Sequence, residues 1–439
     1  MKIAGRLLNG GRPDLAAKIA PTPSEQKIRS KGGVLAIIVK GYPRLSETFI
    51  AQEILALQDL GYSILIVSLR HPTDQKTHNL HRLIKAPVLY LPEYLHDEPW
   101  RVLRSLGRQL LNIRLYQVLA LFAADWFRDR TRNRARRFGQ ALVLASELPA
   151  DAGWLYAHYL HTPSAVTRYT AKLRQLSWSI SAHAKDIWTS EKWQIRQHLT
   201  AAEWCVTCTA NNAAFLKSIQ DQTPVHLIYH GLDFDKLPDC AVPERPKDEQ
   251  GPLTIVTVAR AVEKKGLDTL LEAFAQASQD RPMRWLQIGG GPERDRLAAL
   301  ANALGVGDRV EFLGALDREE VFAYLAKADL FCLPARIAAD GDRDGLPNAL
   351  MEAMHMRLPV IASNLPGIAE LVIDGETGVL IEPDNVPELA SAIGRLADDP
   401  QLRTNMGELG RVVVHERFHM AQGIERLSAL LPKNLRACG

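Results

Sequence analysis

Short apolar runs alternate along this chain with stretches in which apolar residues recur at helical spacing. Val34–Val39 is continuously apolar and Ser63–Ser68 nearly so, and the segment between them predicts a helix that ends near Leu60. Such runs are typical of parallel strands that are buried on both faces. The pattern starts again at Leu253–Val258. The chain is therefore predicted to be α/β, with two doubly wound, Rossmann-like domains facing across a cleft.

The same pattern divides the chain, whose 439 residues are too many for one ordinary domain. Prolines and charged residues concentrate just before the pattern restarts, as they do in linkers. We expect the last helix to pack back toward the first domain. The predicted divisions are a loose leader (1–31), a first domain (32–237) with a helical insertion (97–148), a linker (238–252), a second domain (253–418) and a C-terminal helix (419–439).

The overall charge gives no strong pull toward nucleic acid, because 53 Lys and Arg stand against 50 Asp and Glu, a net of +3. The five cysteines form no even framework, which favours a reducing cytoplasm. Cys205 and Cys208 have the spacing of a redox motif but stand at the exit of an apolar strand. No apolar run reaches the length of a membrane-spanning helix. No metal site is expected.

The insertion is strongly basic. Its stretch 101–137 holds ten arginines and no lysine against Asp125 and Asp129, a local net charge of +8, and leucines and aromatic residues recur between the arginines. Two interpretations stay open. A basic amphipathic stretch can rest on an anionic membrane surface. Alternatively, the helices pack on the domain and leave a solvated arginine face.

Candidate ligand groups of the first domain follow its strands, since ligands of parallel α/β sheets lie beyond the carboxyl ends of the strands. The loop after the first strand carries Ser46, Glu47 and Thr48. It fits either a ligand loop or a plain connection. His158 and His183 end two successive strands, so we expect them to point into one crevice.

The second domain offers groups for a phosphorylated ligand. Arg260 and Lys265 flank a strand-to-helix loop, where they could neutralise a diphosphate. A glycine run around Gly290 would let the backbone approach a ligand closely. The spacing of that run is not the dinucleotide fingerprint, so a nicotinamide enzyme is disfavoured.

The segment from Asp344 to Glu352 follows an apolar strand and ends on a short predicted helix. Asp344 could accept hydrogen bonds from sugar hydroxyls, and Glu352 could hold the two ribose hydroxyls. The backbone N–H groups of Gly345 and Leu346 precede a helix, where phosphate is favoured. Pro347 suits the first helical turn. An acidic loop whose aspartate merely caps a helix fits the same residues.

Taken together, the ordered motifs of the second half resemble glycosyltransferase family 4, whose members are retaining enzymes with the GT-B fold. The resemblance covers nearly all of residues 253–385. It rests on Val258-Ala-Arg260, Lys265-Gly266, Gly289-Gly-Gly-Pro292, Phe312-Leu-Gly314, the Asp344-to-Glu352 segment and Gly367-Ile-Ala-Glu370. In the first half, Pro43-Arg-Leu-Ser46-Glu47-Thr48, His158 and Ser181-Ala-His183 are similar to the subgroup that builds exopolysaccharides such as colanic acid and amylovoran.

The resemblance implies a role for each matching position. Arg260 and Lys265 would bind the donor diphosphate and stabilise the leaving nucleotide, which is catalysis that needs no metal. Glu352 would hold the ribose, and His183 would contact the transferred sugar. The remaining nucleotide-sugar contacts would come from Gly290, Gly314, Gly345, Leu346 and Pro347, and the loop of Ser46, Glu47 and Thr48 would approach from the acceptor side, as would His158.

One position departs from the family. Its first glutamate falls on Asp344, whose side chain is one methylene shorter, and this puts the reach to the donor sugar in question. Both the activity and the identity of the donor depend on that reach.

The resemblance thus implies a hexosyltransferase that needs no cofactor and takes a UDP- or GDP-sugar as donor. Its acceptor would be a lipid-linked saccharide or oligosaccharide of exopolysaccharide or lipopolysaccharide synthesis, and the anomeric configuration would be retained. The protein would be cytoplasmic and peripheral on the inner face of the plasma membrane. Two alternatives share the fold: a sugar-nucleotide epimerase or phosphorylase, and a non-catalytic sugar-nucleotide-binding protein.

Overall fold

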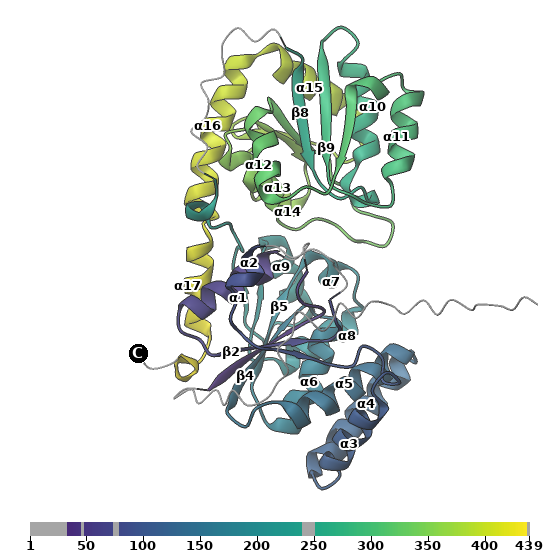
Figure 1. Ribbon diagram of the computed structural model, residues 1–439, viewed down its shortest axis with the longest axis vertical. Helices are drawn as coiled ribbons and strands as arrows, with labels where there is room; N and C mark the ends of the chain where they lie inside the picture. The colour runs from purple at the N-terminus through teal and green to yellow at the C-terminus, as the bar shows by residue number, and fades with distance from the viewer. Residues whose placement is uncertain (1–32, 45–47, 73–78, 239–250, 437–439) are drawn as a thin grey trace, which may run out of the picture.

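Two parallel-sheet, Rossmann-like domains make up the protein, as the sequence predicts, and Figure 1 shows one above the other. The computed structural model describes residues 33–44, 48–72, 79–238 and 251–436. The expected leader, Ser46, Glu47 and most of the expected linker lie outside the described residues.

The first domain is built on a seven-stranded parallel sheet in the order β3-β2-β1-β4-β5-β6-β7. Its elements are β1 (Val34–Val39), α1 (Thr48–Asp59), β2 (Ile64–Ser68), α2 (Asn79–Leu83), β3 (Val88–Tyr90), α3 (Pro99–Gln109), α4 (Ile113–Arg128), α5 (Arg132–Glu147), β4 (Ala152–His158), α6 (Thr162–Arg174), β5 (Trp178–Ala182), α7 (Ala184–Trp188), α8 (Lys192–Ala201), β6 (Cys205–Thr207), α9 (Ala210–Ile219) and β7 (Val225–Leu227).

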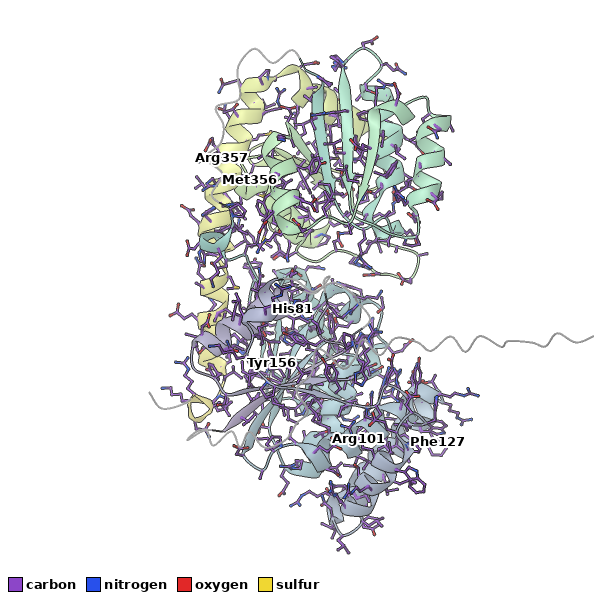
Figure 2. All side chains as sticks on the ribbon, viewed as in Figure 1. His81, Arg101, Phe127, Tyr156, Met356 and Arg357 are labelled. Atoms are coloured by element: carbon purple, nitrogen blue, oxygen red, sulfur yellow. The ribbon has the colours of Figure 1, made fainter. Side chains whose placement is uncertain are left out.

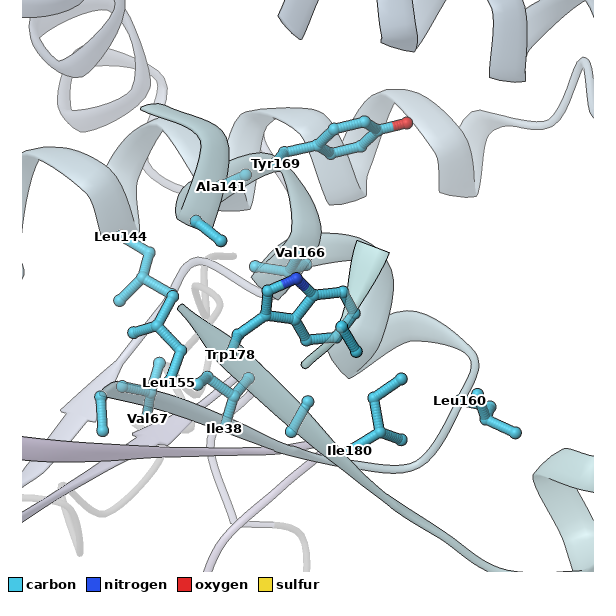
Figure 3. Packing of buried hydrophobic residues seen from close by; sticks show 14 of the residues in the cluster. Ile38, Val67, Ala141, Leu144, Leu155, Leu160, Val166, Tyr169, Trp178 and Ile180 are labelled. Atoms are coloured by element: carbon cyan, nitrogen blue, oxygen red, sulfur yellow. The ribbon is translucent and has the colours of Figure 1, made fainter. Parts of the chain in front are cut away.

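Strand β1 shows why the apolar runs become buried strands. All its residues are buried, because helices cover both faces of the sheet. Leu35 and Ile37 pack with α1 on one face, and Ile38 packs with the helices of the other face. Figure 3 shows this second cluster, in which Ile38 and Leu155 lie below Val166 of α6.

The second domain has a six-stranded parallel sheet in the order β10-β9-β8-β11-β12-β13. Its elements, with the three helices that follow the last strand, are β8 (Leu253–Val258), α10 (Leu267–Ala277), β9 (Met283–Ile288), α11 (Arg294–Ala303), β10 (Val310–Gly314), α12 (Arg318–Lys327), β11 (Leu330–Leu333), α13 (Asn348–His355), β12 (Val360–Ser363), α14 (Pro366–Ala369), β13 (Gly378–Ile381), α15 (Val386–Asp398), α16 (Pro400–Arg417) and α17 (Met420–Leu430).

The strand order reverses once in each sheet, between β1 and β4 and between β8 and β11. Loops that leave the carboxyl ends of two such strands run to opposite faces of the sheet and open a crevice for ligands. In the second domain the loops after β8 and β11 carry Arg260, Lys265 and Asp344. The topology therefore brings the donor residues expected from the sequence to one crevice.

The two last helices connect the domains again. Helix α16 lies along the second domain, and α17 runs on beside the first (Figure 1). Leu427 of α17 and Leu431 join the core cluster that contains Ile54 of α1. The Tyr62 hydroxyl lies 2.9 Å from Ser428 Oγ. Helix α17 therefore packs on the first domain, as expected from the sequence.

Three details of the secondary structure concern the predictions. Pro347 precedes α13 as its N-cap residue instead of occupying the first turn. Residues 378–381 form the strand β13, and the residues before Gly378 turn back on it, with the Gly375 N–H bonded to the Gly378 carbonyl at 2.9 Å. Within the described part of the chain, no helix combines the length and apolarity needed to cross a membrane.

Candidate active site between the two domains

The loop after β11 places Asp344 directly on the loop after β8. Asp344 Oδ2 lies 2.5 Å from Lys265 Nζ, and Asp344 Oδ1 lies 3.3 Å from Lys264 Nζ. Gly266 allows this approach: its φ is +60°, and a Cβ there would lie 1.9 Å from the Pro334 carbonyl oxygen. The cation expected to bind the diphosphate thus contacts the carboxylate expected to bind the sugar.

The carboxylates of the loop after β11 are paired with the lysines of the loop after β8. Burial alone would raise the pKa of Asp344, but Lys265 and Lys264 outweigh burial and hold the pKa below its ordinary value. Asp342 lies 3.1 Å from Lys264 Nζ and 3.3 Å from the Nζ of Lys185, which belongs to the first domain. Asp344 is therefore ionised at neutral pH and is held by lysines instead of capping a helix.

The loops after β8, β9 and β10 are bonded to one another beside this ion pair. The Gly290 carbonyl accepts an N–H from the loop after β8 at 2.9 Å, and the Gly289 N–H donates to the Gly314 carbonyl at 2.7 Å. A Cβ on Gly289 would lie 2.1 Å, and one on Gly291 2.3 Å, from a carbonyl oxygen of the loop after β8. These two glycines therefore allow a close approach to protein backbone and not to a ligand. Gly290 and Gly314 face open space, and Arg260 is exposed.

Gly345 and Leu346 lie against the first domain. A Cβ on Gly345 would lie 3.3 Å from Ala184 Cβ and 3.6 Å from Cys208 Sγ. The Leu346 backbone N–H acts to lower the pKa of the Cys208 thiol, so it lies near that sulfur. The two N–H groups expected to be offered to a phosphate are therefore next to the first domain.

Glu352 lies on α13, which Pro347 leads into. Burial raises the pKa of Glu352 to about 7, and the nearby Arg318 acts in the opposite direction. The carboxyl group therefore changes its charge near neutral pH. In its ionised form it is a strong acceptor for hydroxyl groups.

The prediction that His158 and His183 share one crevice is confirmed. His158 Nδ1 lies 3.4 Å from His183 Nε2. A third histidine joins them, with His230 Nε2 at 3.3 Å from His183 Nδ1. Burial holds the pKa of His183 well below its usual range and lowers that of His230 to about 4, so both rings are neutral at pH 7.

Asp186 fixes the strand ends that carry two of these histidines. Its Oδ1 accepts the His183 backbone N–H at 3.0 Å, and its Oδ2 accepts the Leu160 N–H at 2.5 Å. Burial raises the pKa of Asp186 to about 7, although these backbone bonds act to lower it. Thr48, the described residue of the predicted N-domain loop, opens α1 nearby.

Two residues of the cleft were not given roles from the sequence. Glu370 accepts the backbone N–H groups of Ala210 at 2.8 Å and Asn211 at 3.2 Å, and so caps helix α9 of the other domain. Its partners lie 160 residues away in sequence, so no local signal predicts the contact. Glu53 could have been found from the sequence, because it is a charged residue among the apolar, buried positions of α1.

Two groups of side chains among the described residues could hold a metal ion. The donor atoms of His183, Cys208 and His230 lie within 4.8 Å of one another, as do those of a second set, Asp233, Asp235 and His419. Burial raises the pKa of the Cys208 thiol to about 12. The cysteines of the redox-type spacing are both buried free thiols.

A cavity of about 570 Å³ lies beside α17. Helices α1 and α2 line it together with Lys236 and Arg318. None of the predicted donor-site residues lines this cavity, although Arg318 also acts to lower the pKa of Glu352, one of those residues.

Two facing Rossmann-like domains, with charged loops at the switch point of the second, define a protein of the GT-B fold. A solved structure of this fold, Anabaena HepE in complex with UDP-glucose, superposes with a TM-score of 0.64 at 18% identity over 91% of this chain and 100% of that one. Residues 242–413 match the family described as "Glycosyl transferases group 1", so the chain carries a domain of that family.

The curated relatives agree with the expected subgroup. WcaL of Escherichia coli, named for colanic acid biosynthesis, is 29% identical over 415 residues, which are 86% of this chain and 92% of WcaL. AmsK of Erwinia amylovora, an amylovoran biosynthesis glycosyltransferase, is 36% identical over 186 residues, or 42% of this chain and 45% of AmsK.

Proposed function

We propose that this protein is a metal-independent glycosyltransferase that moves a hexose from a UDP- or GDP-sugar to a lipid-linked saccharide in exopolysaccharide or lipopolysaccharide synthesis, with retention of configuration. The observation that carries the proposal is the Lys265–Asp344 pair at the switch point of a glycosyltransferase group 1 domain. Glu352 on the adjoining helix and exposed Arg260 complete a set of charges that suits a nucleoside diphosphate and a ribose.

The chemistry asked of these residues is electrostatic. As the bond between sugar and diphosphate breaks, negative charge grows on the leaving phosphate. Lys265 and Arg260 would stabilise that charge at a site already shaped to hold it. The name of the HepE complex includes UDP-glucose, which supports a UDP-sugar as the first donor to test.

The test is binding followed by turnover. Thermal unfolding of wild type would be measured with UDP-, GDP-, ADP- and dTDP-sugars. A ligand at about 100 times its Kd stabilises the fold by roughly 2.7 kcal/mol. Lys265→Ala should lose the effect of the active donor, and Lys327→Ala, which changes an exposed lysine of the same domain, should keep it.

Turnover of that donor separates the proposal from its alternatives. Transfer should require a saccharide acceptor. Conversion of the sugar nucleotide without acceptor would indicate an epimerase, and a requirement for inorganic phosphate would indicate a phosphorylase. Binding without any turnover would identify a non-catalytic protein and would overturn the proposal.

The lipid-linked acceptor is supported by the surface of the helical insertion. Helices α3 and α4 project from the sheet at the lower right of Figure 1. Leu115 and Val118 are buried in the domain core, and Val102, Leu106, Leu121 and Phe122 are partly buried against it. Core packing does not account for the remaining apolar side chains of this hairpin. Those that are exposed are Trp100, Leu103, Leu110, Leu111, Ile113, Tyr116, Leu119 and Phe127.

We call this exposed surface the α3–α4 face. Leu111 is 100% exposed and Trp100 is 81% exposed, and Figure 2 shows Phe127 at the outer side of the hairpin. A monomeric protein rarely exposes so many large apolar side chains together unless they meet a partner or a membrane.

The charges of the α3–α4 face select the partner. Arg104, Arg108 and Arg128 are exposed on it. The single acidic residue between Pro99 and Arg128 is Asp125, which is fully buried and bonded to Tyr169 at 2.5 Å. A second copy of this face would be repelled by its own charge. An anionic bilayer complements both the arginines and the apolar side chains.

Sedimentation with vesicles tests the α3–α4 face. Wild type should bind vesicles of phosphatidylglycerol and phosphatidylcholine more tightly than vesicles of phosphatidylcholine alone. Each arginine near the surface contributes about 1 kcal/mol, so Arg104→Gln/Arg108→Gln should weaken binding roughly thirtyfold. The control Arg395→Gln/Arg426→Gln changes exposed arginines elsewhere. Equal sedimentation of both double variants would contradict the assignment.

A further inference from the structure

A row of polar side chains runs from the buried side of helix α1 to the cleft. Glu53 Oε1 lies 3.2 Å from His158 Nε2, a close polar contact that lacks hydrogen-bond geometry. His158 Nδ1 lies 3.4 Å from His183 Nε2, and His183 Nδ1 lies 3.3 Å from His230 Nε2. In His158 and His183, Nε2 faces the preceding group of the row and Nδ1 faces the next ring. The row is continuous from a carboxylate to a partly exposed imidazole.

The row is shielded from solvent. Glu53 is 7% exposed, His158 is 0% exposed and His183 is 7% exposed. The Phe49 ring packs at 4.8 Å, between ring centroids, on both His183 and His230. Buried polar groups are costly unless they are paired. Because water is excluded here, the side chains of the row must find their partners among one another and their protein neighbours.

The His158–His183 contact is aligned as a hydrogen bond. The two ring planes are 8° apart, and their centroids are 5.7 Å apart. That separation is close to the nitrogen–nitrogen distance plus the two ring radii, so the nitrogens point at each other within a common plane. The second contact is bent, since the His183 and His230 centroids are 5.1 Å apart with the planes at 27°.

The carboxylate sets the direction of every proton in the row. A hydrogen on His158 Nε2 is favoured beside the Glu53 carboxyl oxygen, because a lone pair on that nitrogen would face the lone pairs of the oxygen. In the tautomer with its hydrogen on Nε2, His158 Nδ1 accepts from His183 Nε2–H. His183 Nδ1 in turn accepts from His230 Nε2–H. All three rings therefore adopt the same tautomer, with the proton on Nε2.

We infer that Glu53 and His158 are positioning residues that fix the ring orientation and tautomer of His183, and through it of His230, at the cleft. The structural part of this inference stands on the contacts above. Its consequence for turnover rests on the proposed function, in which His183 contacts the transferred sugar. Glu53 itself touches no reacting atom.

The side chains around the row are compatible with a proton on Nε2 of His183. The Tyr156 hydroxyl faces Glu53 and Ser181, and Ser181 Oγ lies 3.3 Å from His183 Nε2, where a hydroxyl can accept from the same proton. On the side of α17, the small cavity next to Glu53 and His230 is lined by apolar side chains such as Ile424 and Leu427. The other titratable groups near His183 and His230 include His161 and Cys208, and the Tyr159 ring packs on His183 at 4.8 Å between centroids.

The variants separate charge, acceptor and bulk at position 53. Glu53→Gln keeps an oxygen that accepts from His158, whereas Glu53→Leu fills the space without an acceptor. Gln52→Leu is the matched control, since Gln52 is the preceding residue of α1 and is also 7% exposed. Long-range nitrogen–proton correlation spectra of protein labelled in its 13 histidines report which ring nitrogen carries the proton. His158→Gln and His183→Gln assign the signals.

Wild type and Gln52→Leu should show the Nε2–H tautomer for all three rings. Glu53→Leu should lose it for His158 and His183, and Glu53→Gln should restore it. With a donor identified, Glu53→Leu should lower kcat about tenfold at unchanged donor KM, because His183 is no longer held in one orientation toward the sugar. Glu53→Gln should recover most of that loss.

Two results would overturn the inference: an Nδ1–H tautomer for His158 or His183 in wild type, or unchanged ring signals in Glu53→Leu. If wild type transfers no sugar from any donor, the proposed function fails, but the spectra still decide the arrangement of the row. The two failures are therefore distinguishable.

Discussion

Asp344 should compete with the donor diphosphate for Lys265. The Lys265 side chain is 15% exposed and the Asp344 side chain is 8% exposed, and Lys265 Nζ lies 2.5 Å from Asp344 Oδ2. A diphosphate that binds Lys265 must replace this carboxylate. Hydrogen bonds to charged groups contribute about 1.5–3 kcal/mol, so Asp344→Asn should tighten binding of free UDP or GDP by about tenfold or more.

The same substitution should weaken the fold. Asp344→Asn leaves Lys264 and Lys265 without the carboxylate that they share. Removing one partner of a buried pair costs about 3 kcal/mol of unfolding free energy. The variant should therefore bind a nucleoside diphosphate more tightly although its unliganded form is less stable. A simple structural role for Asp344 predicts weaker binding together with lower stability.

Titration calorimetry with UDP and GDP measures the first effect, and urea unfolding measures the second. Asp342→Asn is the control, because Asp342 contacts Lys264 and Lys185 and leaves the Lys265–Asp344 pair in place. Equal or weaker nucleotide binding by Asp344→Asn, in a variant that still unfolds cooperatively, would refute the competition. Transfer of sugar should fall in the same variant, since a neutral amide accepts more weakly from sugar hydroxyls.

Three further predictions concern carboxyl groups near the cleft. Burial raises the pKa of Glu352 to about 7, so nucleotide affinity measured by calorimetry should fall as the pH drops from 8 to 6, and Glu352→Gln should remove the part of this dependence that comes from Glu352. Burial also raises the pKa of Asp186 to about 7. The folded protein therefore binds a proton at Asp186 more tightly than the unfolded chain does. This stabilises the fold fully below pH 3.8, and the stabilisation is lost as the pH rises through 7. In wild type the urea midpoint should decline over that interval, and Asp186→Asn should make the decline smaller. Glu370→Ala removes the cap that joins the domains, and X-ray scattering should show a larger radius of gyration than for the exposed-loop control Glu376→Ala.

The sequence predicts the fold well because its strands are buried on both faces. Runs such as Val34–Val39 and Leu253–Val258 have no polar alternation that would suggest an exposed sheet. Once the sheets are parallel, the strand ends fix where Arg260, Lys265 and Asp344 lie. The location of the candidate site therefore follows from local patterns and one topological rule.

Partners across the domain boundary could not be predicted in this way. The direct contact of Asp344 with Lys265, the packing of Gly345 against Cys208 and the partners of Glu370 all depend on tertiary packing. The insertion shows a second limit. Helical periodicity identifies which side chains share a face, but it does not say whether protein, water or lipid covers Leu111.

The interactions between the domains use the groups that the proposed donor needs. Gly345 packs against Ala184 and Cys208, Asp342 binds Lys185, and Asp344 occupies Lys265. A donor phosphate that reaches the N–H groups of Gly345 and Leu346 must displace the first-domain residues packed there, and this weakens the contact between the two domains. The free energy of donor binding would then be offset in part by the weaker attachment of the two domains. We therefore expect donor affinity and domain separation to be coupled, so that a substitution that loosens the domains, such as Glu370→Ala, also changes the donor Kd.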